Sequence, residues 1–182
     1  MQKIKELYVD SIKEFKITHN MVICGFMAAL AIVLSYVASI QLGPYLKIGF
    51  SGIPNRIVEF LFGPVIGCIF GGALDILKFL IKPDGPFFFG FTFNAMLAGV
   101  IYGSILYKKP VKLWRIVLAE FLVKLIVNCF FNTLWISMLY GKGFLAILPP
   151  RVIKNIIMLP VDSIILFCIL TFIQKFRRQL HI

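Results

Sequence analysis

Long apolar stretches, interrupted by short polar breaks, run along this 182-residue chain. The pairs Gly43-Pro44 and Gly63-Pro64 and the run 82–86 mark the sharpest breaks. Most of the stretches approach the roughly 20 apolar residues that a helix needs to cross a bilayer. The pattern therefore predicts an all-α membrane protein, a bundle of six transmembrane helices, at about 21–40, 54–62, 64–81, 94–107, 113–140 and 151–176.

A different pattern precedes the first apolar stretch. Between residues 3 and 16, charged and apolar side chains alternate at roughly helical spacing. Such a segment is typical of a short helix that lies in the membrane interface. We therefore expect an amphipathic helix on the inner membrane surface, with an apolar side formed by Ile4, Leu7, Tyr8, Ile12 and Phe15.

The composition excludes several classes of protein. Hydrophobic residues make up 60% of the chain and charged residues 15%, and the mean hydropathy is +0.93. Soluble domains carry about 25% charged residues, so this chain has too few polar side chains to cover a water-exposed globule. Soluble globular, disordered and disulfide-rich secreted proteins are therefore excluded. The four cysteines lie far apart within apolar stretches, and we expect free thiols.

The net charge of +11 is distributed along the chain in a way that predicts membrane topology. Lysine and arginine stand at the ends of apolar stretches, whereas a nucleic-acid-binding protein gathers them on one soluble face. No nucleic-acid partner is therefore expected. The N-terminal segment, the turn 108–115 and the C-terminal tail are the most basic segments, and the positive-inside rule places them in the cytoplasm. Both termini are then cytoplasmic, and the loops 41–53, 82–93 and 141–150 face outward.

Polar and aromatic side chains gather toward the outward end of the predicted bundle. A charge near the middle of a span costs on the order of 3 kcal/mol, so each needs a partner or a cavity. Aromatic rings stack on a flat ring, amides bind ring edges, and arginine or lysine pairs with carboxylates. These residues therefore predict a site for a heteroaromatic ligand that carries carboxylates. The candidate ligand-binding residues are Lys47, Arg56, Phe89, Phe91, Thr92, Asn94, Asn132, Trp135, Arg151, Lys154 and Asn155.

Several of these residues have a second interpretation that the sequence leaves open. Arg56 with Glu59, and Asp75 with Lys78, are spaced i,i+3 and are able to neutralise each other. The aromatic run 87–93 suits either an interfacial belt or a lid over the site.

Charges on the last two predicted helices also have two interpretations. Arg151 and Lys154 suit either the ligand or snorkelling to lipid headgroups. Glu120 and Lys124, spaced i,i+4, favour a structural pair. Asp162 lies in mid-span and is expected to pair across helices, with a partner that the sequence does not identify.

The first predicted membrane helix carries small residues at short intervals: Gly25, Ala28, Ala29, Ala31 and Ser35. Small side chains at a spacing of four let another helix approach closely within the bilayer. The approaching helix belongs either to this chain or to another membrane subunit.

Motifs of enzyme chemistry are absent from the sequence. It contains no GxxxxGK[ST] phosphate loop, no HExxH, no GxSxG and no cysteine–histidine cluster with metal-ligand spacing. We therefore expect no catalytic residue, no metal and no cofactor. Uphill transport would need energy from a partner or from an ion gradient.

Two segments carry a resemblance to a known family. They are FSGIPNRIVEFLFGPVIGCIFGGALDILKFL, at 50–80, and FNAMLAGVIYG, at 93–103. Both resemble the substrate-binding S components of energy-coupling factor (ECF) transporters. Two further segments, FNTLWISMLYGKGF and LPPRVIKNIIMLP, look like the folate-specific S component. The resemblance covers about residues 20–175.

The resemblance implies a function and a set of partners. Such a protein captures extracellular folate at high affinity in a bacterial cell membrane, associates with a transmembrane coupling subunit and two ATPases, and topples in the membrane to release folate inward. The small residues near Gly25 would meet the coupling subunit. Arg151 and Lys154 would pair with the glutamate or with polar groups of the pterin, while Trp135 and the phenylalanines would stack.

The resemblance also implies a division of the chain into three parts. Residues 1–20 form an amphipathic cytoplasmic-surface segment, 21–176 a six-helix transmembrane substrate-binding domain, and 177–182 a basic cytoplasmic tail. Three alternatives remain: an S component for another vitamin such as pantothenate or riboflavin, a membrane-integrated lipid enzyme using Asp75 and Lys78, and an assembly protein without a ligand.

Overall fold

The computed structural model describes residues 2–37, 39–41, 47–81, 83, 86–141 and 143–179. Within them, five helical stretches are long and apolar enough to cross a membrane. The predicted all-α membrane bundle is confirmed, because one of these stretches, α3, is divided by a kink into the two predicted helices 54–62 and 64–81. The elements are α1 (Gln2–Phe15), α2 (Thr18–Val37), β1 (Ser39–Gln41), β2 (Lys47–Gly49), α3 (Ile53–Ile81), α4 (Phe89–Leu106), α5 (Leu113–Leu122), η1 (Val123–Phe131), α6 (Asn132–Tyr140) and α7 (Phe144–Gln179).

The kink in α3 lies at Gly63, where the sequence predicted a break. Gly63 has φ 88° and ψ −170°, a backbone conformation that only glycine adopts without strain. A Cβ atom at this position would lie 2.8 Å from the ring of Tyr107 and 3.0 Å from Ser11. Both the backbone conformation and the close packing therefore require glycine.

Close contact between α3 and α4 forms the centre of the bundle. A Cβ atom on Gly99 would lie 2.4 Å from the carbonyl oxygen of Gly67, and one on Gly103 would lie 2.5 Å from Pro64. The two helices thus touch backbone to backbone, which small residues permit. Large buried side chains of α4, α5 and α7, among them Tyr102, pack beside this contact.

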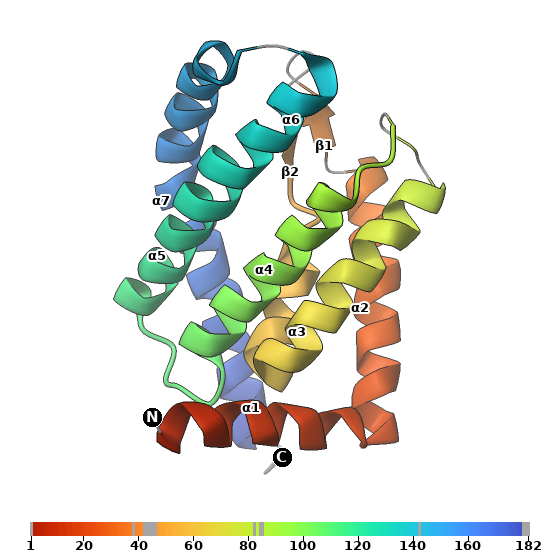
Figure 1. Ribbon diagram of the computed structural model, residues 1–182. Coiled ribbons are helices and arrows are strands. Elements are labelled where there is room, and N and C mark those ends of the chain that lie inside the picture. Colours follow the sequence, from red (N-terminus) through yellow and green to blue (C-terminus); the bar gives the residue numbers. More distant parts are fainter. Residues whose placement is uncertain are drawn as a thin grey trace.

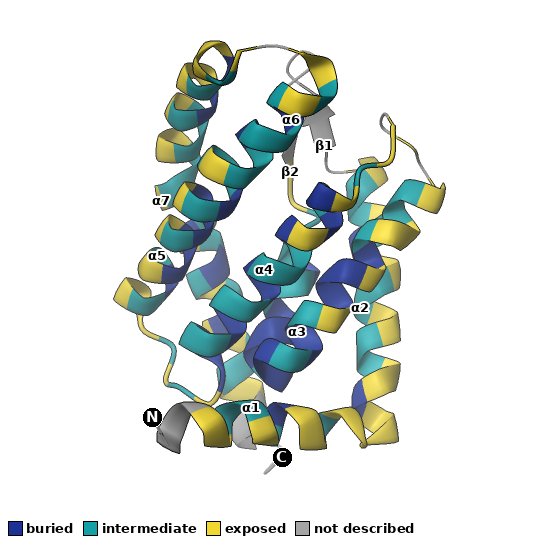
Figure 2. Ribbon diagram, in the orientation of Figure 1, coloured by how far each residue is buried: buried dark blue, intermediate teal, exposed yellow. Residues whose placement is uncertain are grey.

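The outer surfaces of α2 and α7 carry exposed apolar side chains (Figure 2). Phe26 on α2 and Phe172 on α7 are examples. Large exposed apolar side chains on helices of spanning length are expected where the solvent is lipid.

α1 lies across one end of the bundle, and the C-terminal end of α7 reaches the same end (Figure 1). The strands β1 and β2, residues 86–88 and the C-terminal end of α6 lie at the opposite end. This arrangement agrees with the predicted grouping of three loops at one end. Which end faces the cytoplasm remains a prediction.

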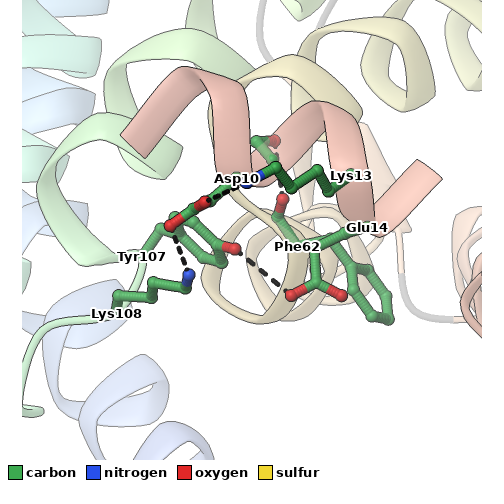
Figure 3. A network of polar contacts seen from close by, with 7 residues as sticks. Asp10, Lys13, Glu14, Phe62, Tyr107 and Lys108 are labelled. Atoms are coloured by element: carbon green, nitrogen blue, oxygen red, sulfur yellow. Dashed lines mark hydrogen bonds and ion pairs between the residues drawn. The ribbon is translucent and has the colours of Figure 1, made fainter. Parts of the chain in front are cut away.

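α1 is bound to the bundle by polar side chains (Figure 3). Tyr107, after the end of α4, donates to Glu14 over 3.4 Å, and Lys108 forms a 2.7 Å ion pair with Asp10. The predicted apolar side of this helix is divided, since Ile12 and Phe15 are exposed whereas Leu7 and Tyr8 are partly buried. The side chain of Ile4 lies outside the described residues.

Two predicted boundaries in the first half of the chain are wrong. The first membrane helix ends at Val37, because Ser39–Gln41 pairs antiparallel with Lys47–Gly49. α4 begins at Phe89, so most of the aromatic run predicted as a loop is helical. Pairing and helix packing between distant segments decide these boundaries, and the sequence pattern does not contain them.

The last two membrane segments also differ from the prediction. The predicted helix 113–140 contains a π-helical turn region, η1, between α5 and α6. α7 begins at Phe144 and passes through Pro149, Pro150 and Pro160. Proline has no backbone N–H, so three carbonyl groups one turn earlier in α7 lack their α-helical donor. Residues 144–150 of the predicted loop 141–150 thus belong to α7.

Candidate ligand-binding site

A cavity of about 680 Å³ lies between α3, α4, η1, α6 and α7, and Gly49 of β2 is among its lining residues. Small-molecule sites in proteins have volumes of about 300–1,000 Å³. Among the described residues, five basic and two acidic side chains line it. The excess of positive charge favours an anionic ligand. The charged lining residues are Arg56, Lys78, Lys124, Arg151, Lys154, Asp75 and Asp162.

Arg56 is engaged with residues of the protein at the cavity wall. Its guanidinium group lies 3.0 Å from a carboxylate oxygen of Glu59, which is 1% exposed, and 3.7 Å from the ring centre of Tyr102. The ion pair that the i,i+3 spacing predicted is therefore formed. Because Glu59 balances its charge, Arg56 contributes less to the attraction of an anion.

Lys124, on η1, joins two acidic residues. Its ammonium group lies 3.5 Å from Glu120 and 2.5 Å from Asp162. The predicted pair of Glu120 and Lys124 is present, and the partner of Asp162 is identified. The link connects η1 to α7, since Asp162 lies on α7.

Asp75 on α3 is held by the start of α4. The hydroxyl of Thr92, which is buried, donates to Oδ2 of Asp75 over 2.8 Å. Lys78, one turn along α3, donates to the carbonyl of Ser51 over 3.4 Å. Asp75 and Lys78 line the cavity, whereas Thr92 stands behind Asp75. Thr92, predicted as a ligand residue, therefore orients a lining side chain.

Arg151, Lys154 and Asn155 bring the predicted cationic group of α7 to the cavity wall. Arg151 is 8% exposed and donates to the carbonyl of Asn128 over 3.5 Å. Asn128 in turn donates to Asn155 over 3.3 Å. Since Arg151 is buried against η1 and lines the cavity, its position favours the ligand interpretation over snorkelling.

The predicted aromatic group divides between the cavity and the surface. Phe91 lines the cavity together with Phe87 and Phe88. Phe89 is 65% exposed and is not among the lining residues, so its predicted ligand role is not supported. The reason is geometric: residues two apart on a helix face different sides. A loop, as predicted, would not have imposed this separation.

Of the asparagines that line the cavity, three have a buried side-chain atom without a partner in the described part of the chain. Asn55, Asn94 and Asn132 line it, and each has one buried side-chain atom without a hydrogen-bond partner among the described residues. The atoms are Oδ1 of Asn55 and Asn132 and Nδ2 of Asn94. Trp135, predicted to stack on the ligand, lies behind Asn94 and donates to it over 3.2 Å. Lining residues of the cavity thus hold two acceptor atoms and one donor atom without a partner among the described residues.

Lys47 lies in β2, and its side chain falls outside the described residues, as do the side chains of 177–182. The predictions for these positions stay open. Sequence reasoning missed Ser51, and it assigned Ser35 to partner docking although Ser35 lines the cavity. No pattern around Ser51 distinguishes it from an ordinary loop residue.

The small residues of α2 do not form one face. Gly25 and Ala29 are exposed, and a Cβ atom on Gly25 would meet nothing within 4 Å. Ala31 is fully buried beside Val58, and Ala28 packs against the same cluster. The predicted docking role of Ala31 is therefore corrected, because a helix turns by about 100° per residue and sends this side chain to the inner side. For Ala28 and Ser35, which are partly exposed, the docking role stays a prediction.

Comparison with known proteins agrees with this architecture. The family described as "ECF transporter, substrate-specific component" matches residues 19–170. The folate transporter FolT of Clostridium novyi (strain NT) is 37% identical over 147 residues, which cover 81% of this chain and 85% of that protein. The folate transporter FolT of Leuconostoc mesenteroides is 35% identical over 153 residues, 80% of each chain.

Among solved structures, that of FolT bound with folic acid is similar to this chain. The TM-score is 0.77 and the sequence identity 34%, with 83% of this chain and 92% of that chain covered. These similarities extend over the membrane helices and confirm the resemblance on which the sequence interpretation rested. The chain belongs to the substrate-specific components of ECF transporters, which are transporter subunits and not enzymes.

Proposed function

We propose that this protein captures folate from outside the cell as the substrate-specific component of an ECF importer. The observation that carries the proposal is one cavity that combines the cationic side chains of Arg151 and Lys154 with the phenylalanine rings at the start of α4. The two curated relatives are named folate transporters, and the similar solved structure contains folic acid.

The chemistry of folate matches the cavity wall. Its glutamate part carries two carboxylates, which the guanidinium of Arg151 and the ammonium of Lys154 suit as charge-assisted partners. Its flat pterin ring suits the aromatic side chains of Phe88 and Phe91, and the polar ring edge suits the amides of Asn94 and Asn132. A ligand without carboxylates would leave a surplus of positive charge in the cavity.

Delivery of the ligand requires partners. We propose that the protein lies in a bacterial cell membrane and docks onto a transmembrane coupling subunit that carries two ATPases. The exposed residues Gly25 and Ala29 on α2 supply a surface where another helix approaches closely. We propose that the turn 108–115 and α1 lie on the cytoplasmic side, because both are rich in lysine and the positive-inside rule puts such segments there. Residues 1–20 and 177–182 then flank the membrane domain 21–176 on that side.

Calorimetry on the purified, detergent-solubilised protein tests the ligand assignment. We expect tight binding of folic acid and no comparable binding of riboflavin or pantothenate. Mass spectrometry of small molecules that copurify with the protein gives an independent reading. Absence of folic acid binding, or tighter binding of another vitamin, would overturn the assignment.

A further inference from the structure

The indole of Trp135 determines the orientation of the Asn94 amide. Its Nε1 donates to Oδ1 of Asn94 over 3.2 Å. An indole N–H is only a donor, whereas an amide carries an acceptor oxygen and a donor nitrogen. The opposite amide orientation would place two donors against each other. Nδ2 of Asn94 is therefore the atom directed away from the indole.

Nδ2 of Asn94 is a buried donor on a residue that lines the cavity. Asn94 is 6% exposed and lines the cavity, and Nδ2 has no hydrogen-bond acceptor among the described residues. Buried donors in proteins nearly always have an acceptor, so an unpaired one calls for an explanation. A ligand in the cavity that offers an acceptor atom to Nδ2 supplies it.

The ring of Trp135 is itself held from three sides. It stacks on Phe131 with ring centres 6.0 Å apart and contacts Phe88 at 5.5 Å. On the third side, a Cβ atom on Gly90 would lie 2.7 Å from the indole. The absence of a side chain at Gly90 therefore makes room for the ring. Packing of this kind holds the indole in one orientation, and the indole in turn holds the Asn94 amide in one orientation.

Residues of α6 and α4 thus hold two opposite hydrogen-bonding groups on the cavity wall. Trp135 sets Asn94 as a donor, and Thr92 holds the carboxylate of Asp75, an acceptor, over 2.8 Å. Asp75 and Asn94 both line the cavity. A heteroaromatic ring with carbonyl and amino substituents requires both kinds of group.

We propose that Trp135 is a positioning residue that directs Nδ2 of Asn94 to donate to an acceptor atom of the ligand's heteroaromatic ring. This replaces the expectation that Trp135 stacks on the ligand. The inference rests on the proposed function, because it takes the pterin of folate as that ring. A site built to bind a ring atom by hydrogen bonding discriminates against analogues that lack the atom. Trp135 and Asn94 therefore determine specificity for the ring end of the ligand.

Affinities of ligand analogues test the proposal on the full-length protein in detergent. Aminopterin carries an amino group in place of the 4-oxo group, 5-deazafolic acid lacks the N5 acceptor, and p-aminobenzoylglutamate lacks the pterin. We expect the wild type to prefer folic acid over at least one of the first two analogues. Trp135→Phe should weaken folic acid binding about tenfold and reduce that preference. Binding of p-aminobenzoylglutamate should not change.

A second variant and a matched control complete the test. Asn94→Asp replaces the donor by an acceptor and should reverse a preference of folic acid over aminopterin. Trp114→Phe makes the same substitution at an exposed tryptophan on α5 and should leave all affinities at the wild-type level. The proposal would be overturned if the ratio of folic acid affinity to analogue affinity were the same in the wild type, Trp135→Phe and Asn94→Asp.

Loss of folding in Trp135→Phe would not end the test. Benzothienylalanine at position 135, in the Trp114→Phe background, keeps the ring size and removes only the N–H donor. A changed preference in that protein supports the proposal, and an unchanged one overturns it. If the wild type fails to bind folic acid, the proposed function fails; if it binds but the preferences never change, only the present inference fails.

Discussion

Ser11 on α1 donates a hydrogen bond to the carbonyl oxygen of Phe62 over 2.7 Å, at the point where the first half of α3 ends. The same hydroxyl accepts hydrogen bonds from the backbone N–H groups of Val65, at 3.1 Å, and Ile66, at 3.4 Å. A helix end leaves such groups without partners within the helix. A side chain from α1 thus satisfies the backbone on both sides of the kink at Gly63.

Ser11→Ala should therefore destabilise the protein without changing ligand affinity. The substitution leaves buried backbone groups unpaired, at a cost of about 1–3 kcal/mol. The thermal midpoint measured by intrinsic fluorescence should fall, while folic acid affinity stays constant, because Ser11 lies on α1 and is not among the residues that line the cavity. Lys16→Ala, an exposed change next to α1, is the control. An unchanged midpoint would show that water replaces the hydroxyl at no cost.

Arg151→Ala should weaken folic acid binding by about 2 kcal/mol or more, because removal of a buried charge leaves a ligand carboxylate unpaired. Arg151→Lys should recover part of the loss, since an ammonium keeps the charge but not the bidentate geometry. Calorimetry measures both variants. Lys175→Ala, an exposed basic residue on the same helix, is the control. Wild-type affinity in Arg151→Ala would assign Arg151 to a structural role.

Two alanines on α2 should respond differently to enlargement. Ala29→Trp adds a large side chain to an exposed position and should leave folic acid binding intact while abolishing uptake by the complete transporter. Ala31→Trp overfills a fully buried position beside Val58 and should lower the stability by about 1–3 kcal/mol or more. Uptake into proteoliposomes and thermal midpoints separate these effects. Normal uptake by Ala29→Trp would contradict the docking surface.

Removal of Lys124 should destabilise the bundle more than removal of either acidic partner. Lys124→Met leaves both Glu120 and Asp162 without their cation, and an uncompensated buried charge costs about 3–5 kcal/mol. Asp162→Asn leaves Lys124 paired with Glu120 and should cost less. The order of the denaturation midpoints checks this. A wild-type midpoint for Asp162→Asn would mean that the link between η1 and α7 does not contribute to stability.

The ion pair between Asp10 and Lys108 predicts a pH dependence of α1 attachment. The hydrogen bond with Lys108 lowers the pKa of Asp10 below its ordinary value of 3.8, and the same bond raises the pKa of Lys108 above 10.5. The stabilisation from the lowered carboxyl pKa is present above pH 3.8 and is lost as the pH falls through the lower folded value. The stabilisation from the raised lysine pKa is present below pH 10.5 and is lost as the pH rises through the higher folded value.

Comparison of the wild type with Asp10→Asn tests this window. The difference in amide hydrogen exchange of α1, corrected for intrinsic rates, should be constant at intermediate pH and should shrink toward both extremes. High salt should reduce it as well, since the pair is partly exposed. A difference that stays the same in acid and at high salt would assign the effect to packing.

Local pattern was sufficient for much of the fold. The apolar lengths predicted the membrane helices, and the pair Gly63-Pro64 predicted the kink, because both depend on properties of neighbouring residues. The i,i+3 pair of Arg56 and Glu59 followed from helical spacing in the same way. The general location of the cationic and aromatic residues at one end also followed, since charge is costly elsewhere in a membrane.

Other features depended on contacts between distant segments. Asp162 meets Lys124 across helices, Ala29 and Ala31 point to opposite sides of α2, and Trp135 supports Asn94 from behind the cavity wall. The pairing of β1 with β2 and the π-helical region η1 also carry no periodic signal of their own.

The amino-acid sequence by itself determined that this protein crosses the membrane as helices, where those helices break, and which rare polar residues are available for a ligand. Hydrophobicity and the conformational freedom of the backbone are properties of single residues, so their effects follow from the order of residues in the chain. Tertiary structure alone decided which of those polar residues line a common cavity and which support them, because helix rotation and packing set the direction of every side chain.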